Sequence, residues 1–302
     1  MEEKQPRRVA FEILLWFIAF VITVSSAIYQ RLTGPTYPIR GKIELNQKIY
    51  KYKLHRTHGG LEDHQVKLEI PDTSVTGELV YKLYYPRKKQ FLSSVKSMFS
   101  DSSSRMSLKM DSLWTTLPMR RVDSALVADL PHQDPAGKIM YKVILKTQNQ
   151  TATLPGDEPV IIRFKGAVPN FILYPHILLM FLAMLVSNRA GMEALRKNRN
   201  PRLFALWATA LLFIGGMILG PVMQEFAFGE FWTGFPFGYD LTDNKTLIAM
   251  IGWIIAVYAG RRDKPAHRWV LAASILLFII YLIPHSVLGS ELDYSQMPAP
   301  GK

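Results

Sequence analysis

Long apolar runs divide this chain into segments of two kinds. Five runs contain no Lys or Arg, and they cover residues 13–29, 171–187, 203–223, 247–260 and 269–284. A helix rises about 1.5 Å per residue and the hydrocarbon core of a bilayer is about 30 Å thick, so runs of this length, or nearly so, cross it. The fourth run is the weakest, because it is short and follows Asn244 and Lys245 directly. The pattern predicts five membrane-spanning helices.

Between the first two runs, over residues 31–167, apolar and polar positions alternate with a period of two. The alternation is clearest over 65–70, 78–83 and 138–146, and weaker strands are expected over 42–54, 125–130 and 159–165. This period is typical of half-buried strands. About seven short strands in a segment of this length predict an antiparallel, immunoglobulin-like β-sandwich. A Ser-rich stretch near 88–112 has no usable period and is expected to be a solvated insertion in that domain.

The net charge of +12 is explained by the positions of the basic residues. They cluster near residues 4–8, 189–202 and 261–268, each time beside an apolar run. By the positive-inside rule these clusters are cytoplasmic, which places residues 31–167 and the C-terminus outside the cell membrane. The first run is expected to be an anchor covering residues 1–30, because Trp16 and Phe17 are bulky. A cleaved signal peptide is the alternative, since Ser25 and Ala27 form a small-residue cleavage site.

The sequence excludes several kinds of chemistry. The chain has no cysteine, which excludes disulfides, thiolate metal sites and thioether attachment of a cofactor. The segment 31–167 has no nucleophile elbow, phosphate-binding glycine loop or paired-ligand helix motif, and we expect a protein that is not an enzyme. His55, His58 and His64 lie close together in the sequence, but their spacing around the Gly59-Gly60 turn matches no familiar ligand set and does not predict a metal there.

The most informative segment is the loop before the fourth run, within residues 224–248. It is rich in aromatic, glycine, proline and acidic residues. Aromatic side chains gathered at a membrane surface either anchor the protein in the interface or form a platform for a flat apolar ligand. Composition alone leaves both interpretations open.

The order of residues in this part of the chain resembles a known family. Trp232, the pair Tyr239-Asp240, the run Asn-Lys-Thr-Leu-Ile at 244–248 and the pair His285-Ser286 follow one another as in the C-terminal part of cytochrome c biogenesis haem-handling proteins. The likeness covers about residues 228–286. Tyr239 stands where that family has tryptophan, and the further spans of its larger members are missing.

The resemblance implies a site for haem at the outer membrane face. Trp232, Tyr239 and Asp240 would belong to the haem-facing loop, and His285 would be an axial ligand of the iron. The candidate for the second ligand is His176, because it lies near the outer end of the second run. Two such histidines in different spans can ligate one iron.

The sequence therefore predicts a multi-pass protein of the plasma (inner) membrane with a periplasmic domain and a four-helix membrane domain over 168–302. Its expected function is that of an accessory or binding protein that binds or relays haem in cytochrome c biogenesis. One alternative is a non-catalytic assembly subunit whose sandwich docks an extracytoplasmic partner; another is a protein that handles small ions or lipids. The expected partners are the lipid bilayer and other membrane or extracytoplasmic proteins, with no nucleic acid.

Overall fold

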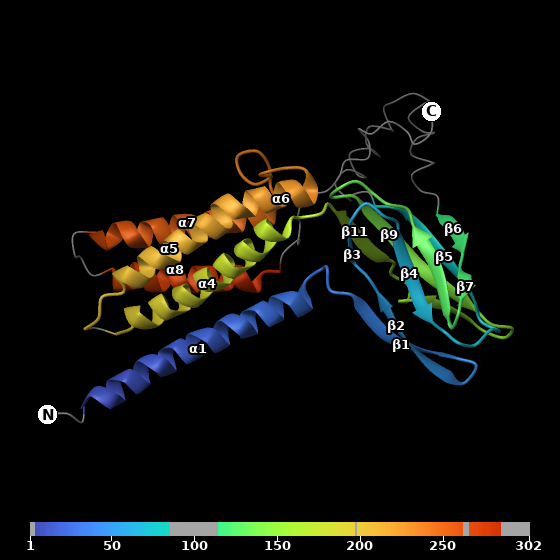
Figure 1. Ribbon diagram of the computed structural model, residues 1–302, viewed down its shortest axis with the longest axis horizontal. Helices are drawn as coiled ribbons and strands as arrows, with labels where there is room; N and C mark the ends of the chain where they lie inside the picture. The colour runs from blue at the N-terminus through green and yellow to red at the C-terminus, as the bar shows by residue number, and fades with distance from the viewer. Residues whose placement is uncertain (1–3, 85–113, 197, 262–265, 285–302) are drawn as a thin grey trace. The chain divides into compact units, whose positions relative to one another are not determined.

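The computed structural model describes residues 4–84, 114–196, 198–261 and 266–284 of the 302-residue chain (Figure 1). The described residues form two compact units. One contains residues 4–35 and 168–284 and is helical, and the other contains residues 36–84 and 114–167 and is built from strands.

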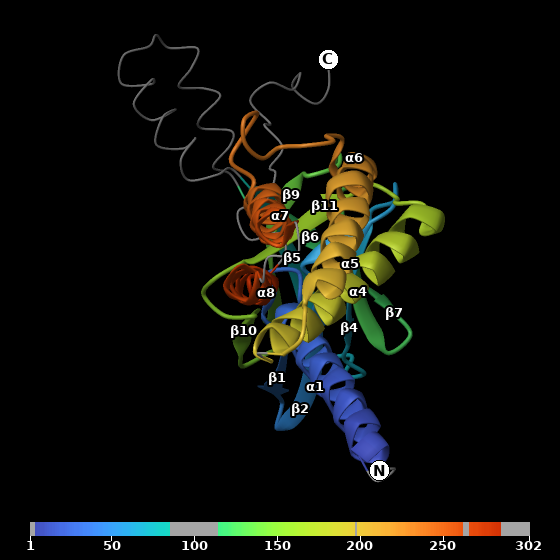
Figure 2. The ribbon, with the colours of Figure 1, turned by 90° about the vertical axis from the view of Figure 1, so that its left-hand side faces the viewer.

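The helical unit consists of an N-terminal helix and a bundle that follows the β-rich unit in the sequence. The elements are α1 (Lys4–Thr33), α4 (Asn170–Ala194), α5 (Arg202–Leu212), the π-helix η1 (Phe213–Leu219), α6 (Gly220–Phe228), α7 (Leu241–Ala259) and α8 (His267–Leu282). Helix α4 packs against α1, α5 and α8, while α7 packs against α5 and α8, as the view along the bundle shows (Figure 2). Small residues such as Ala183, Ala208 and Ala273 line the core of the bundle around Trp253.

Within the described residues, three helical segments are long and apolar enough to cross a membrane. They are Arg8–Thr33, Asn170–Ala194 and the continuous stretch Arg202–Phe228, which joins α5, η1 and α6. Helix α8 is apolar but shorter, and α7 begins with a polar first turn that contains Asp243 and Lys245. The apolar runs therefore identify the helices correctly, and three of them have the length and apolarity of membrane spans.

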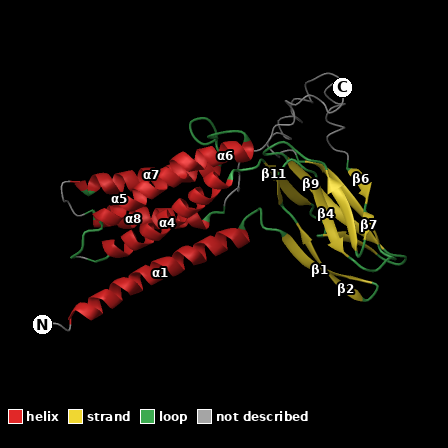
Figure 3. Ribbon diagram, viewed as in Figure 1, coloured by secondary structure: helices red, strands yellow, loops and turns green. Residues whose placement is uncertain are grey.

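The β-rich unit contains three antiparallel arrangements of strands (Figure 3). The strands are β1 (Ile39–Leu45), β2 (Lys48–Leu54), β3 (Thr57–Gly59), β4 (His64–Glu69), β5 (Thr76–Leu83), β6 (Thr115–Pro118), β7 (Arg120–Val122), β8 (Ala125–Leu130), β9 (Lys138–Lys146), β10 (Thr151–Leu154) and β11 (Val160–Lys165). Strands β1 and β2 form a hairpin; a second sheet has the order β3-β11-β9-β5-β6 with β10 beside β9; a third has the order β4-β8-β7. One pair departs from the antiparallel pattern, because β3 runs parallel to β11.

Strand β9 carries much of the core of this unit. Its residues Ile139, Tyr141, Val143 and Leu145 are fully buried, and they alternate with partly buried neighbours. The side chains of β4 alternate in the same way, with Val66 and Leu68 buried. Because successive side chains of a strand point to opposite faces, each strand contributes one face to a shared apolar core. The period-two prediction over 65–70 and 138–146 is confirmed.

The predicted number of strands was too low. The stretch 42–54 forms parts of two strands, since Asn46 and Gln47 both have positive φ, 50° and 64°, and make a two-residue turn between β1 and β2. Such turns match the twist of the flanking strands but usually contain glycine, so this one lacks its usual sequence signal. The short strands β3, β6, β7 and β10 were also not predicted. The expected insertion near 88–112 lies outside the described residues.

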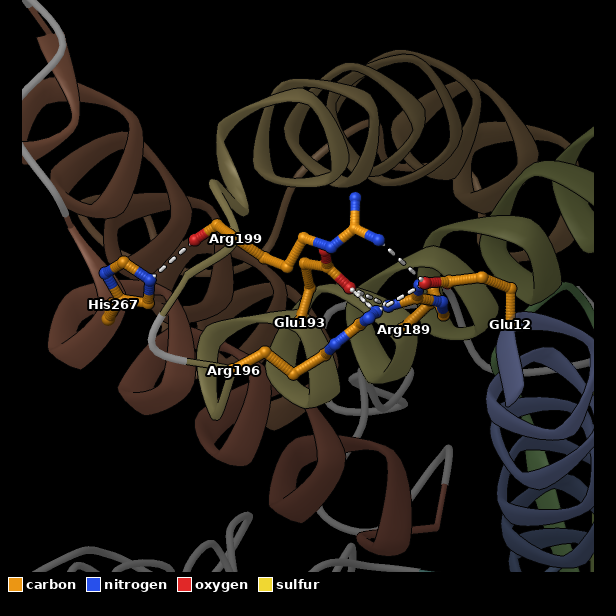
Figure 4. A network of polar contacts seen from close by, with 6 residues as sticks. All are labelled: Glu12, Arg189, Glu193, Arg196, Arg199 and His267. Carbon is orange, nitrogen blue, oxygen red and sulfur yellow. Dashed lines mark hydrogen bonds and ion pairs between the residues drawn. The ribbon is translucent and has the colours of Figure 1, made fainter. Parts of the chain in front are cut away.

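Helix α1 is joined to the bundle by polar contacts along its length. Near its start, Glu12 pairs with Arg189 and Arg196 of the α4 region (Figure 4). Midway, Asn188 Nδ2 donates to Thr23 Oγ1 at 3.0 Å, and near the end Gln30 Nε2 donates to the carbonyl of Tyr281 at 2.9 Å. These contacts give α1 defined partners within the helical unit.

Candidate functional site

The loop between α6 and α7, residues 229–240, is held in place by the carboxylate of Asp243. Its Oδ2 accepts hydrogen bonds from the backbone N–H of Thr233 at 2.7 Å, from Thr233 Oγ1 at 3.1 Å and from Gln224 Nε2 at 3.1 Å. Asp243 is in the first turn of α7 and Gln224 is on α6, and both side chains are buried. The carboxylate therefore joins the two helices to the middle of the loop that connects them.

Two further residues make hydrogen bonds with the backbone of this loop. Asp240 caps α7, because its Oδ1 accepts a hydrogen bond from the backbone N–H of Thr242 at 2.7 Å, and its own N–H donates to the Thr233 carbonyl. Asn244 Oδ1 accepts a hydrogen bond from the backbone N–H of Phe235 at 2.7 Å. A side chain that accepts a backbone hydrogen bond at a helix start supplies a partner that the first turn otherwise lacks. The loop thus has an ordered backbone.

While its backbone is ordered, the loop leaves its aromatic rings exposed. Phe231, Phe235, Phe237 and Tyr239 have exposed fractions of 57%, 67%, 83% and 92%. Soluble surfaces rarely gather large apolar side chains in this way, and such a patch marks a site of interaction with a ligand, a membrane or another protein. Trp232 is less exposed, and its Nε1 donates to the carbonyl of Phe235 at 3.1 Å.

His176 lies in the bundle against the π-helix η1. Its Nδ1 donates to the carbonyl of Gly215 at 2.9 Å, and the ring lies beside Gly220 at the start of α6. The π-helix ends just before Pro221, a residue that has no N–H to donate and whose ring disturbs the preceding turn. Single-turn π segments of this kind are frequent at functional sites.

The bond from His176 to Gly215 suits a metal ligand. A carbonyl only accepts, so Nδ1 carries the proton, and Nε2 of the neutral ring is left with a free lone pair. Histidines that bind metals commonly donate their other N–H to a carbonyl in this way. The ligand role predicted for His176 is compatible with this tautomer. The second predicted ligand, His285, lies outside the described residues, and the part of the chain that is described holds no group of three or more His, Asp or Glu side chains placed for a metal.

The predicted site residues have unequal structural roles. Tyr239 is fully available to a ligand, whereas Asp240 is buried and caps α7, and Trp232 bonds the loop backbone. The residues that shape the loop, Asp243 and its partner Gln224, were not predicted from the sequence. The only sequence signal for them was the presence of acidic and amide groups on both sides of an aromatic loop.

The class of protein that these features define is a β-rich domain joined to a bundle of helices, several of which are apolar and long enough to cross a membrane. Comparison with protein-family models, with curated proteins and with solved structures finds no match for this chain.

Proposed function

We propose that the protein is a non-catalytic binding protein of the plasma membrane that holds haem at the outer membrane face, in cytochrome c biogenesis. The observation that carries this proposal is the loop between α6 and α7. Its backbone is fixed by Asp243, yet it exposes four aromatic side chains. A rigid display of rings suits a flat apolar ligand, because little conformational freedom is lost when the ligand binds.

His176 supplies the polar part of this site. The loop follows α6, and the His176 ring lies beside the first residue of that helix. Helix α6 has nine residues, so the His176 imidazole and the loop are separated by about 13 Å along the axis of this helix. A ligand that contacts both must extend along α6. When bound, haem would supply an iron centre, and the Nε2 atom of His176 would be its ligand. The loop residues would orient the haem macrocycle and exclude water.

The proposed topology follows from charge. In it, five helices cross the membrane, the N-terminus is cytoplasmic, and the β-rich unit is an immunoglobulin-like sandwich on the outer side. Arg189 lies near the C-terminal end of α4 and Arg196 just beyond it, and His176 lies near the N-terminal end of the helix. If the basic end faces the cytoplasm, as the positive-inside rule favours, His176 and the aromatic loop face outward.

The test is an absorbance spectrum of the detergent-purified full chain from haem-replete cells, oxidised and then reduced with dithionite. We expect a Soret band that is lost or shifted in His176→Gln and lost in a double variant that adds His285→Ala. The matched control is His267→Gln, since this histidine bonds the Arg199 carbonyl at the opposite end of the bundle. A featureless spectrum would contradict haem binding, and a band unchanged in the double variant would contradict the assignment of these two histidines as ligands.

A second experiment tests the aromatic loop itself. Tyr239 is 92% exposed, so Tyr239→Ala should leave accumulation and thermal stability unchanged and weaken haem binding. If this substitution abolished accumulation of the protein, the loop would be part of the structural core and the proposed platform would be wrong.

A further inference from the structure

Two histidines of the β-rich unit face each other at ligand distance. His58 is on β3 and His64 begins β4, and their Nδ1 atoms are 3.1 Å apart. Between them the chain turns at Gly60, whose φ of 110° is a conformation that favours glycine. The two rings are brought together by strands of different sheets, since β3 pairs with β11 and β4 pairs with β8.

The hydrogen bonds of the pair fix where its protons are. His58 Nε2 donates to the carbonyl of Glu62 at 2.9 Å. A carbonyl cannot donate, so Nε2 of His58 carries the proton and Nδ1 of the neutral ring carries a lone pair. His64 Nδ1 must then be the donor of the bond between the rings. One proton therefore lies between two nitrogen atoms that are both potential metal ligands.

The distance between these nitrogens matches the coordination geometry of a metal ion. Metal–nitrogen bonds are about 2.0–2.1 Å long. Two ligands of a tetrahedral ion are then about 3.3 Å apart, and two adjacent ligands of a square-planar ion about 2.9 Å apart. The observed 3.1 Å lies between these values. In addition, the contact from His58 Nε2 to a backbone carbonyl is the contact by which proteins orient histidine ligands.

The surroundings favour a fixed site. His64 is 7% exposed, and the rings of His58 and His55 lie beside it, with ring centres 4.9 Å and 5.4 Å away. His58 also packs edge-on against Phe164 of β11. Because both ligands are on strands or directly beside them, their separation changes little when an ion enters, which lowers the entropy lost on binding.

We propose that His58 and His64 form a binding site for a divalent transition-metal ion, with imidazole Nδ1 atoms as its two protein ligands. The ion takes the place of the proton on His64 Nδ1, that proton moves to Nε2 of the same ring, and both ligands are neutral imidazoles; no electron is transferred. No third His, Asp or Glu is placed to complete the set within the described ranges, so water occupies the remaining positions. Imidazole ligands suit Cu²⁺, Ni²⁺ and Zn²⁺, and Cu²⁺ binds tightest in this series.

The test uses the full chain, purified in detergent without a histidine tag and stripped with a chelator. Titration followed by calorimetry should show one Cu²⁺ per chain, weaker binding of Zn²⁺ and no binding of Mg²⁺. Because two neutral imidazoles bind the ion without losing a proton, the heat at neutral pH should not depend on the ionisation enthalpy of the buffer. We expect His58→Gln and His64→Gln each to weaken Cu²⁺ binding tenfold or more. His132→Gln is the matched control, because this ring also packs against Phe164, the neighbour of His58.

Electron paramagnetic resonance keeps the proposal testable if a variant fails to fold. One equivalent of Cu²⁺ bound to the unaltered chain should show couplings from two imidazole nitrogens. A spectrum without nitrogen couplings, affinity unchanged in both variants, or no Cu²⁺ binding below about 1 mM would overturn the proposal and leave the pair as a hydrogen bond only. The haem experiment depends on His176 and not on this pair, so the two proposals fail independently.

Discussion

Arg189 of α4 forms an ion pair with Glu12 of α1 (Figure 4). The Arg189 side chain is 2% exposed and also bonds Glu193 at 2.7 Å, while Glu12 additionally accepts from Arg196 at 2.6 Å. The Arg189 guanidinium lies 4.7 Å from the centre of the Phe204 ring. A buried charge is tolerated when it has such partners, and its removal leaves them without compensation.

The first prediction concerns this network. Glu12→Gln should lower the free energy of unfolding by about 1–3 kcal/mol, because Arg189 and Arg196 keep Glu193 as a partner but lose the charge of a part-exposed carboxylate. Thermal unfolding of the full chain in detergent, followed by intrinsic fluorescence, measures the change.

A double-mutant cycle controls for the loss of packing. Arg189→Met should be strongly destabilising, and the combination Glu12→Leu with Arg189→Met should destabilise by less than the sum of the two single changes. Additive effects would show that the pair contributes no coupling and that α1 is held by other contacts.

The second prediction concerns the loop carboxylate. Asp243→Ala removes the acceptor for Thr233 and Gln224, and we expect a loss of about 1–3 kcal/mol because buried donors are left unpaired. Hydrogen exchange of the amides over residues 229–240 should become faster. Asp243→Asn keeps one oxygen acceptor and should have a smaller effect. Unchanged exchange in Asp243→Ala would mean that the loop is ordered without this carboxylate.

The third prediction is a pH dependence in the β-rich unit. Hydrogen bonds from Asn46 and Ser74 to the ionised carboxylate hold the pKa of Asp72 at about 2, below its ordinary value of 3.8. A carboxyl with a lowered pKa stabilises the folded state above its unfolded pKa, and this contribution is lost as the pH falls from about 4 to about 2. The melting temperature of the full chain should therefore exceed that of Asp72→Ala at pH 7, and the difference should shrink over that pH range. A constant difference from pH 7 to pH 2 would exclude this role for the carboxylate.

The sequence was a good guide where one physical rule governs many consecutive residues. Buried alternation, as at Val66 and Leu68 of β4, reports the face of a strand, and the apolar runs report helices that face lipid or a helical core. A periodic pattern does not predict the backbone conformation of a single residue. Nothing in the identity of Gln47 indicates a positive φ, so the turn that divides β1 from β2 was missed.

The candidate site was likewise predicted from the sequence only in part. The richness of the loop in aromatic residues could be predicted from composition, and the exposure of Phe237 and Tyr239 agrees with a surface role. The contact of Asp243 with Thr233 could not be predicted, because it joins residues ten positions apart across an irregular loop. The contact of His58 with His64 depends on the pairing of strands in two different sheets, which the spacing of the two residues does not reveal.

The last prediction tests how closely α4 approaches the π-helix. A Cβ atom added to Gly215 would lie 3.0 Å from the Cβ of Leu179 and 3.3 Å from the backbone nitrogen of Met180, so neither neighbour can yield without a movement of α4. Gly215→Ala should therefore destabilise the full chain by about 1–3 kcal/mol. Gly220→Ala is the matched control, because a Cβ there meets its nearest atoms at 3.7 Å and 3.9 Å, which are ordinary contacts.

The same pair of variants reports on the position of His176, because the His176 ring donates to the Gly215 carbonyl. Gly215→Ala should therefore weaken haem binding more than Gly220→Ala does. Equal melting temperatures for the two variants would show that α4 and η1 separate readily, and that the position of His176 is not set by this close approach.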